Sequence, residues 1–187
     1  MGRIIKITID LGQVCNDILT KSNLISKSIL DKALADIRAD VSTPDGDETR
    51  SIICRATTEA LANVKYAAQR WMMKGRVEDN NNLERLVSSI TFKKDISGAA
   101  TTEMESVTYE KVELDMNIPN LNIAVTDALK SNIHKYIVDY NMGRFLQDLV
   151  ADKAKEYTTE ALTLDYPNIV SCLNAREEVT RRTPSFI

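Results

Sequence analysis

The stretch Tyr109–Asn122, YEKVELDMNIPNLN, carries the clearest pattern in this 187-residue chain. From Lys111 to Ile118, hydrophobic and polar residues alternate without interruption. Strict alternation is typical of a β-strand with one buried face and one exposed face. Pro119 predicts the end of the strand, because proline has no amide hydrogen to donate to a sheet. The apolar face would consist of Val112, Leu114, Met116 and Ile118.

Two further segments show strand patterns. In the first, apolar and polar residues alternate from Ile5 to Leu11, with Lys6, Thr8 and Asp10 as the polar set. The second, Leu86–Lys93, shows a weaker alternation. We extend the opening strand back to Val107, so that it forms a long β-hairpin of about 86–118 with Leu86–Lys93. A two-stranded hairpin is marginal in water, so its apolar face needs a cover. The N-terminal strand can join this sheet, and helices can pack on one face.

The remaining chain shows helical periodicity. An apolar stripe begins at Leu11, and Ser22–Val41 is predicted to form one helix. A long helix is predicted for Glu48–Lys74, where small residues on the apolar stripe would let a neighbouring helix approach closely. These patterns predict a mainly α protein with a small antiparallel β-sheet (α+β), in the form of a helical bundle with a long β-hairpin.

Two helices are predicted after the hairpin. The first has an apolar stripe from Val125 to Tyr140, and Gly143 predicts a break or kink. The second covers about Leu146–Leu173, and Pro167 should kink or split it, because proline lacks a donor and clashes with the preceding turn. The residues expected to face inward in this last helix are Val150, Ala154, Tyr157, Ala161 and Leu164.

The last thirteen residues show no periodicity. We therefore divide the chain into one domain of residues 1–174 and an extended C-terminal tail of residues 175–187, which could span on the order of 40 Å. Three arginines, Arg176, Arg181 and Arg182, give this tail positive charge, and Pro184 and Phe186 lie near its end.

Composition and motifs narrow the function classes. The formal net charge of −3 and the pI of about 5.3 do not favour a nucleic-acid-binding protein. No apolar run approaches the roughly 18 residues of a membrane span. Cys15, Cys54 and Cys172 are interpreted as reduced structural residues, and His134 as a structural histidine. Because no catalytic, nucleotide-binding or metal-binding motif is present, we expect a non-enzymatic protein without a cofactor or metal.

Four stretches suggest a family. They are VELDMNIP (112–119), HKYIVDYN (134–141), AKEYTTEAL (154–162) and LNAREEVTRRTP (173–184). In this order the chain resembles the head-to-tail connector proteins of tailed bacteriophages, and its C-terminal part is similar to small phage and prophage proteins of gut Bacteroidales. The resemblance covers roughly residues 1–20 and 107–187. Pro167, inside the last helix, departs from the pattern and affects how the tail is directed.

The resemblance implies a structural virion protein at the neck, made in the host cytoplasm. Connectors of this kind form rings, often of about twelve copies, between the portal protein and the tail proteins. DNA passes through the ring without sequence-specific contact, and no membrane is involved. Hairpins and tails bridge the subunits. The expected assembly interface is therefore Tyr109, Lys111, Glu113, Asp115, Arg176, Arg181, Arg182, Pro184 and Phe186.

Two other functions fit the same sequence. One is a tail-completion or tail-terminator ring protein, which is a neighbouring virion role. The other is a non-virion helical binding module, such as a small cytoplasmic regulator. An enzyme ranks third, because its site would have to consist of Asp and Glu residues without a recognisable motif.

Overall fold

The computed structural model describes residues 2–29, 35–42, 47–72 and 111–175. The two strands are β1 (Gly2–Asp10) and β2 (Lys111–Pro119). The helices are α1 (Leu11–Ser28), α2 (Ala35–Ser42), α3 (Asp47–Ala68), α5 (Thr126–Phe145), α6 (Ala151–Glu160) and α7 (Tyr166–Asn174). A 3-10 turn, η2 (Ile123–Val125), precedes α5, and a π-helical turn, η3 (Ala161–Asp165), joins α6 to α7. This confirms the predicted class, mainly α with a small antiparallel sheet.

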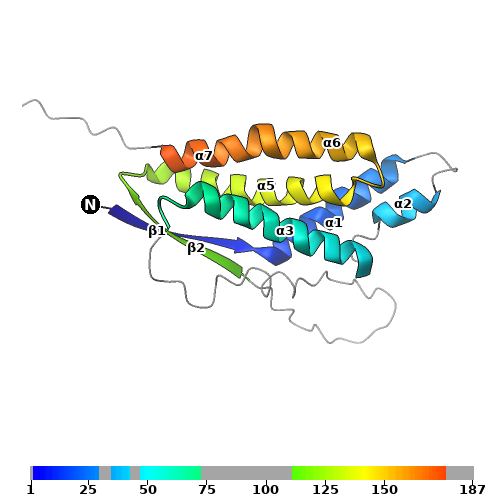
Figure 1. Ribbon diagram of the computed structural model, residues 1–187, viewed down its shortest axis with the longest axis horizontal. Coiled ribbons are helices and arrows are strands. Elements are labelled where there is room, and N and C mark those ends of the chain that lie inside the picture. Colours follow the sequence, from blue (N-terminus) through cyan, green and yellow to red (C-terminus); the bar gives the residue numbers. More distant parts are fainter. Residues whose placement is uncertain (1, 30–34, 43–46, 73–110, 176–187) are drawn as a thin grey trace, which may run out of the picture.

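Helix α5 is the centre of the fold. It packs against α1, α3, α6 and α7. Figure 1 shows α6, η3 and α7 running along α5 on the side away from the sheet, with α3 and the strands on the other side. Small residues on α3, Ala56 and Ala60, are fully buried. The predicted close approach of a helix to this stripe is therefore confirmed, and the helix that approaches is α5.

Strands β1 and β2 form an antiparallel pair in which Gly2 lies opposite Pro119 and Asp10 opposite Lys111. All four apolar residues of β2 are at most 1% exposed, and they share one core with residues of α1, α3 and α5. The chain itself therefore supplies the cover that this apolar face needs, through β1 and the helices. The partner strand predicted at Leu86–Lys93, and residues 107–110, lie outside the described residues.

Local capping explains two element boundaries. The Asp10 Oδ1 atom accepts hydrogen bonds from the amides of Gly12 at 2.9 Å and Gln13 at 3.2 Å, so α1 begins directly after β1. At the end of β2, Pro119 is followed by Asn120, whose φ of 52° lies in the left-handed region. Asparagine tolerates this region better than other residues with a Cβ. The chain can therefore turn sharply from the sheet into η2 and α5.

One predicted helix near the N-terminus needs correction. Ser22–Val41 is not one helix, because α1 ends at Ser28 and Ile29 has extended backbone angles. Helix α2 instead folds back beside α1, where Ser22 donates to the Val41 carbonyl and Ser26 to the Arg38 carbonyl at 3.0 Å. Each of these serine hydroxyls on α1 therefore binds a backbone carbonyl of α2. A single straight helix over Ser22–Val41 could not form these contacts, because its two ends would lie far apart.

The long helix predicted for Glu48–Lys74 ends earlier, at Ala68. The chain then turns so that Met72 forms a bridge with Met116, and the Asn117 amide donates to the Trp71 carbonyl at 2.7 Å. Backbone pairing with β2 thus replaces the last helical turns. The last two residues of the predicted helix, 73 and 74, lie outside the described residues.

The break predicted at Gly143 is also wrong, because α5 continues through it to Phe145. Gly143 is instead a point of close helix packing, where an added Cβ would lie 2.4 Å from Thr158 Oγ1. The predicted start of the last helix at Leu146 is wrong as well, since residues 146–149 form a turn and α6 begins at Ala151.

Pro167 lies in the first turn of α7, directly after the π-helical turn η3 that interrupts the regular α-helix, and the helical run from Ala151 to Asn174 is not split. In η3 the Tyr166 amide donates to the Ala161 carbonyl, five residues back. This wider turn shifts the helical register by one residue. Leu164, predicted to face inward, is therefore 55% exposed, and Asp165 is 2% exposed in its place.

Candidate assembly surfaces

The polar face of the β1–β2 sheet carries three of the predicted interface residues. Lys6 Nζ lies 2.7 Å from Glu113 Oε2, a diagonal contact between the strands, and both side chains are partly exposed. Asp115 lies opposite Lys6 in the register and is half-buried. Lys111 is the first residue of β2, opposite Asp10. An exposed ion pair of this kind contributes only about 0–1 kcal/mol, so Glu113 remains available to a partner.

The remaining predicted interface residues are not placed by the structure. Tyr109, Arg176, Arg181, Arg182, Pro184 and Phe186 lie outside the described residues. The tail begins at Ala175, whose φ of −65° and ψ of 125° direct the chain out of α7 in an extended conformation. In Figure 1 the end of α7 and the start of β1 lie at the same end of the molecule. The tail therefore leaves near the N-terminal end of the sheet.

The hydrogen bond between Asn117 and Trp71 fixes which amides of the sheet point outward. The Asn117 amide points away from β1, toward Trp71. In an antiparallel pair, residues opposite each other are alternately hydrogen-bonded and non-hydrogen-bonded. Asn117 and its partner Ile4 therefore belong to a non-hydrogen-bonded pair. It follows that the backbone amides of Ile4, Lys6 and Thr8 point away from β2.

Strand β1 consequently presents a hydrogen-bonding edge with which none of the described residues pairs, and we refer to it as the open edge of β1. Within the described part of the chain the sheet has two strands, and β1 pairs only with β2. Ile5, Ile7 and Ile9 of β1 are buried, and Lys6 and Thr8 lie on the opposite face. A straight edge of unpaired amides is a template for an added strand. This edge is the feature of the described structure best suited to association with another chain.

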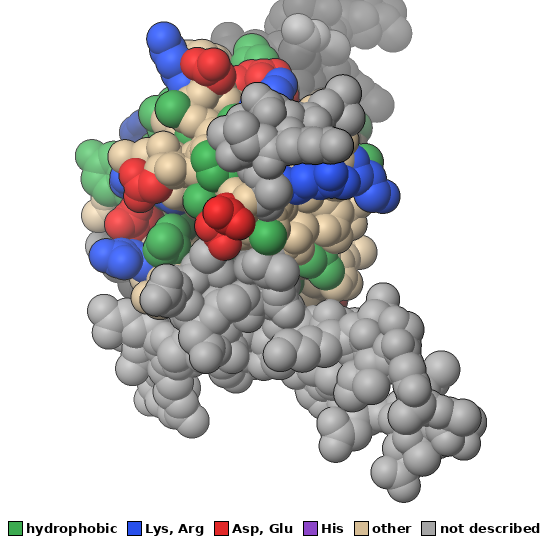
Figure 2. All heavy atoms as spheres, turned by 90° about the vertical axis from the view of Figure 1, so that its right-hand side faces the viewer, with side chains coloured by type: hydrophobic (Ala, Val, Ile, Leu, Met, Phe, Trp, Pro, Cys, Tyr) green, Lys and Arg blue, Asp and Glu red, His purple; other side chains and the backbone are tan. Residues whose placement is uncertain are grey.

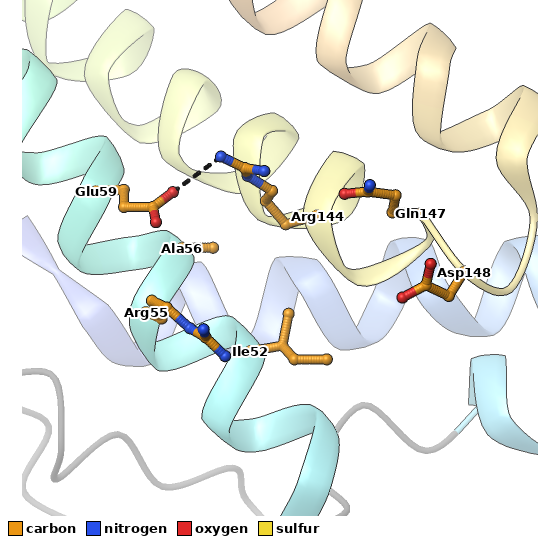
Figure 3. A pocket seen from close by; sticks show the side chains of 7 residues that line it. All are labelled: Ile52, Arg55, Ala56, Glu59, Arg144, Gln147 and Asp148. Atoms are coloured by element: carbon orange, nitrogen blue, oxygen red, sulfur yellow. Dashed lines mark hydrogen bonds and ion pairs between the residues drawn. The ribbon is translucent and has the colours of Figure 1, made fainter.

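A second surface feature is a hollow of about 300 Å³ between α3 and the C-terminal end of α5 (Figure 3). Arg144 spans it and contacts Glu59 Oε2 at 3.2 Å, while the Tyr140 hydroxyl donates to the same oxygen at 2.9 Å. The hydrogen bond to Tyr140 is the main cause that raises the pKa of Arg144. These contacts connect α3 to α5. The lining residues are Ile52, Arg55, Ala56, Glu59, Arg144, Gln147 and Asp148.

The end of the molecule near this hollow carries mixed charges. Figure 2 shows hydrophobic, basic and acidic side chains interspersed there, without a large patch of one sign. Such a surface does not provide the continuous basic stripe that binding to nucleic-acid phosphates requires. The described part of this end therefore offers no argument for direct DNA binding.

The residues considered for chemistry in the sequence have structural contacts. His134 Nε2 lies 2.7 Å from Asp17 Oδ2 and links α5 to α1. Cys15 is buried, whereas Cys54 and Cys172 are half-buried, and all three are thiols. Among the residues that the structure describes, no group of three or more His, Cys, Asp and Glu side chains could hold a metal ion.

Sequence reasoning missed two buried acids, Asp139 on α5 and Asp165 in η3. The signal for Asp139 is its position on the apolar stripe of α5, one turn after Tyr136. The predicted stripe of the last helix passed through Ala161 and Leu164, and the π turn buries Asp165 in place of Leu164. Lys21 and Lys135 were missed because their roles depend on contacts with these two acids.

Comparisons with known proteins give no relatives, since no family model, curated protein or solved structure matches this chain. No helix in the described ranges has the length and apolar character needed to cross a membrane.

Proposed function

We propose that the chain is a structural subunit of a ring at the neck of a tailed bacteriophage, a head-to-tail connector that joins the portal protein to the tail. The observation that carries the proposal is the open edge of β1. The resemblance of the sequence to connector proteins supports the virion role and a ring of about twelve copies. The DNA would pass through the centre of the ring.

The contact between copies follows from the shape of a ring. Head-to-tail contacts in a ring are heterologous, so each subunit uses one surface to bind a different surface on the next. We assign the open edge of β1 as one surface and the tail of the next copy, residues 175–187, as the other. Arg176, Arg181 and Arg182 complement the acidic Glu113 and Asp115 on the sheet, although Glu177 and Glu178 offset part of the positive charge of the tail. At an extended reach on the order of 40 Å, the tail is long enough to cross to a neighbour.

A substitution at Thr8 tests this contact. Thr8→Pro removes an outward amide, and proline is tolerated where the missing donor faces solvent at a sheet edge. Thr8→Val is the matched control, because it keeps the amide and favours a strand. We expect both variants to fold, but only Thr8→Val to form rings, as measured by native mass spectrometry. Rings of Thr8→Pro with the wild-type yield would show that the β1 edge is not the contact.

The virion role needs a separate test. Mass spectrometry of purified particles should detect the chain, and imaging of the neck should place it in a ring next to the portal. Location at the end of the tail would identify a tail-completion or terminator protein instead. Absence from particles, together with a stable complex with one soluble protein, would identify a binding module and overturn the proposal. Deletion of residues 175–187 should leave a folded chain that is not incorporated into particles.

A further inference from the structure

Five charged side chains meet where α1 and α6 contact the middle of α5. Asp139 is 0% exposed and Asp165 is 2% exposed. Lys21 of α1 donates a hydrogen bond to Asp139 Oδ1. Lys135 of α5 donates to Asp165 Oδ1 at 3.0 Å and to Glu160 Oε1 at 2.6 Å. The cluster therefore connects α1, α5, α6 and η3.

The second oxygen of each buried acid has no ordinary hydrogen-bond donor. Asp139 Oδ2 and Asp165 Oδ2 are both buried without a hydrogen bond, and Lys135 Nζ lies 3.7 Å from Asp139 Oδ2. A buried carboxylate oxygen without a donor costs free energy, and such atoms are rare in folded proteins. Two ionised carboxylates cannot satisfy each other, because both are acceptors. A single proton on one of them supplies the missing donor.

The charge balance leads to the same conclusion. The two ammonium groups of Lys21 and Lys135 face three acids, Asp139, Glu160 and Asp165. One added proton makes the cluster neutral. A metal cation at this place would instead lie beside two ammonium groups, which repel it. The structure therefore favours a proton over a cation.

A tyrosine also lies beside the cluster, since Lys21 Nζ is 5.2 Å from the centre of the Tyr157 ring. Burial raises the pKa of Tyr157, so its phenol stays neutral near pH 7. Lys153 and Glu156, which are also near Tyr157, pair with each other at 2.6 Å. Hydrogen bonding to Glu160 raises the pKa of Lys135, which stays charged. The proton therefore has to reside on a carboxyl group.

We propose that Asp139 and Asp165 share one proton between their Oδ2 atoms, and that this proton holds the π turn against α5. The pair is a buried proton-binding site built by the register shift of η3. Loss of the proton leaves two adjacent buried carboxylates, whose repulsion loosens η3 and α7 from α5. The packing of the last helices thus depends on pH.

The direction of this dependence follows from proton linkage. Burial is the main cause that raises the pKa of Asp165 above its ordinary value of 3.8. The folded chain then binds more protons than the unfolded chain between the two pKa values. The contribution of the pair is fully present below the unfolded pKa and is lost as pH rises through the folded pKa.

A carboxyl ¹³C NMR titration of the full chain tests the proposal. We expect one carboxyl group of the pair to titrate with a midpoint above the ordinary value of 3.8. Asp165→Asn mimics the protonated acid, because its amide can donate to Asp139. Its melting temperature should therefore lack the fall with rising pH that the wild type shows. Asp148→Asn, at an exposed position after α5, is the control and should keep that fall.

Two results would overturn the shared proton. One is that Asp165 titrates at or below its ordinary value of 3.8. The other is that Asp165→Asn folds and retains the full pH dependence of the wild type. If Asp165→Asn does not fold, the titration of the wild-type chain decides the question alone.

Discussion

Gly143 of α5 lies directly against Thr158 of α6, and a Cβ at residue 143 would be 2.4 Å from Thr158 Oγ1 and 3.2 Å from the Thr158 amide nitrogen. The absence of a side chain at this point therefore sets the distance between the two helices. Glycine inside a helix costs about 1 kcal/mol relative to alanine. This cost is offset because a residue without a side chain allows α6 to pack closely on α5.

Gly143→Ala should consequently lower the free energy of unfolding, although alanine is the better helix former. Overpacking of a close contact costs about 1–3 kcal/mol, which exceeds the gain in helix propensity. The measurement is urea denaturation of both proteins. The double variant Gly143→Ala with Thr158→Ala removes the nearest clash and should recover most of the loss. A Gly143→Ala protein more stable than the wild type would contradict this account of the contact.

Asn120 should be replaceable by glycine but not by alanine. Its φ of 52° costs a residue with a Cβ roughly 1–2 kcal/mol, and asparagine reduces that cost through its short polar side chain. We expect Asn120→Gly to retain the stability of the wild type within about 0.5 kcal/mol. Asn120→Ala should lose about 1 kcal/mol. Equal stability of the two variants, measured by thermal denaturation, would show that the backbone conformation at residue 120 is not a constraint.

The sequence predicted the strands better than the helix ends, for physical reasons. Period-two alternation depends only on which face is buried, so β2 could be recognised without knowing its partner. The end of α1 at Ser28 depends instead on the contacts of Ser22 and Ser26 with α2. Such long-range contacts leave no local pattern in the sequence.

The candidate surfaces were predicted only in part. Glu113 and Asp115 could be placed on a polar strand face from alternation alone. The open edge of β1 could not be predicted, because it follows from the hydrogen bond between Asn117 and Trp71. The buried pair of Asp139 and Asp165 depends on η3, where a π turn changes the helical register.

The two faces of β2 should respond in opposite ways to substitution. Leu114 is 0% exposed in the core, so Leu114→Ala should lower the free energy of unfolding by about 2–5 kcal/mol. Glu113 lies next in sequence on the polar face, and Glu113→Ala should change stability by less than about 1 kcal/mol. Chemical denaturation of both variants measures the difference. Similar losses at the two positions would mean that both faces of the strand are buried.

The register shift of η3 can be tested at Leu164. This side chain is 55% exposed, whereas a regular α-helix would point it toward the core. Leu164→Gln should therefore change the free energy of unfolding by no more than about 0.5 kcal/mol. Ile169→Ala, at a buried position of α7, should cost about 2–5 kcal/mol. A large loss for Leu164→Gln would show that this part of the chain is a regular helix.

Glu160 should contribute to stability at neutral pH but not in acid. Its hydrogen bond to Lys135 lowers its pKa below the ordinary 4.5. A lowered folded pKa gives a contribution that is present above the unfolded pKa and is lost as pH falls through the folded value. Because both side chains are partly exposed, Glu160→Gln should cost at most about 1 kcal/mol at pH 7. The difference from wild type should disappear at a pH well below the lowered pKa. Glu156→Gln, whose partner Lys153 is exposed, is the control and should have a smaller effect. An equal loss for Glu160→Gln at acid and neutral pH would mean that its role is packing and not charge.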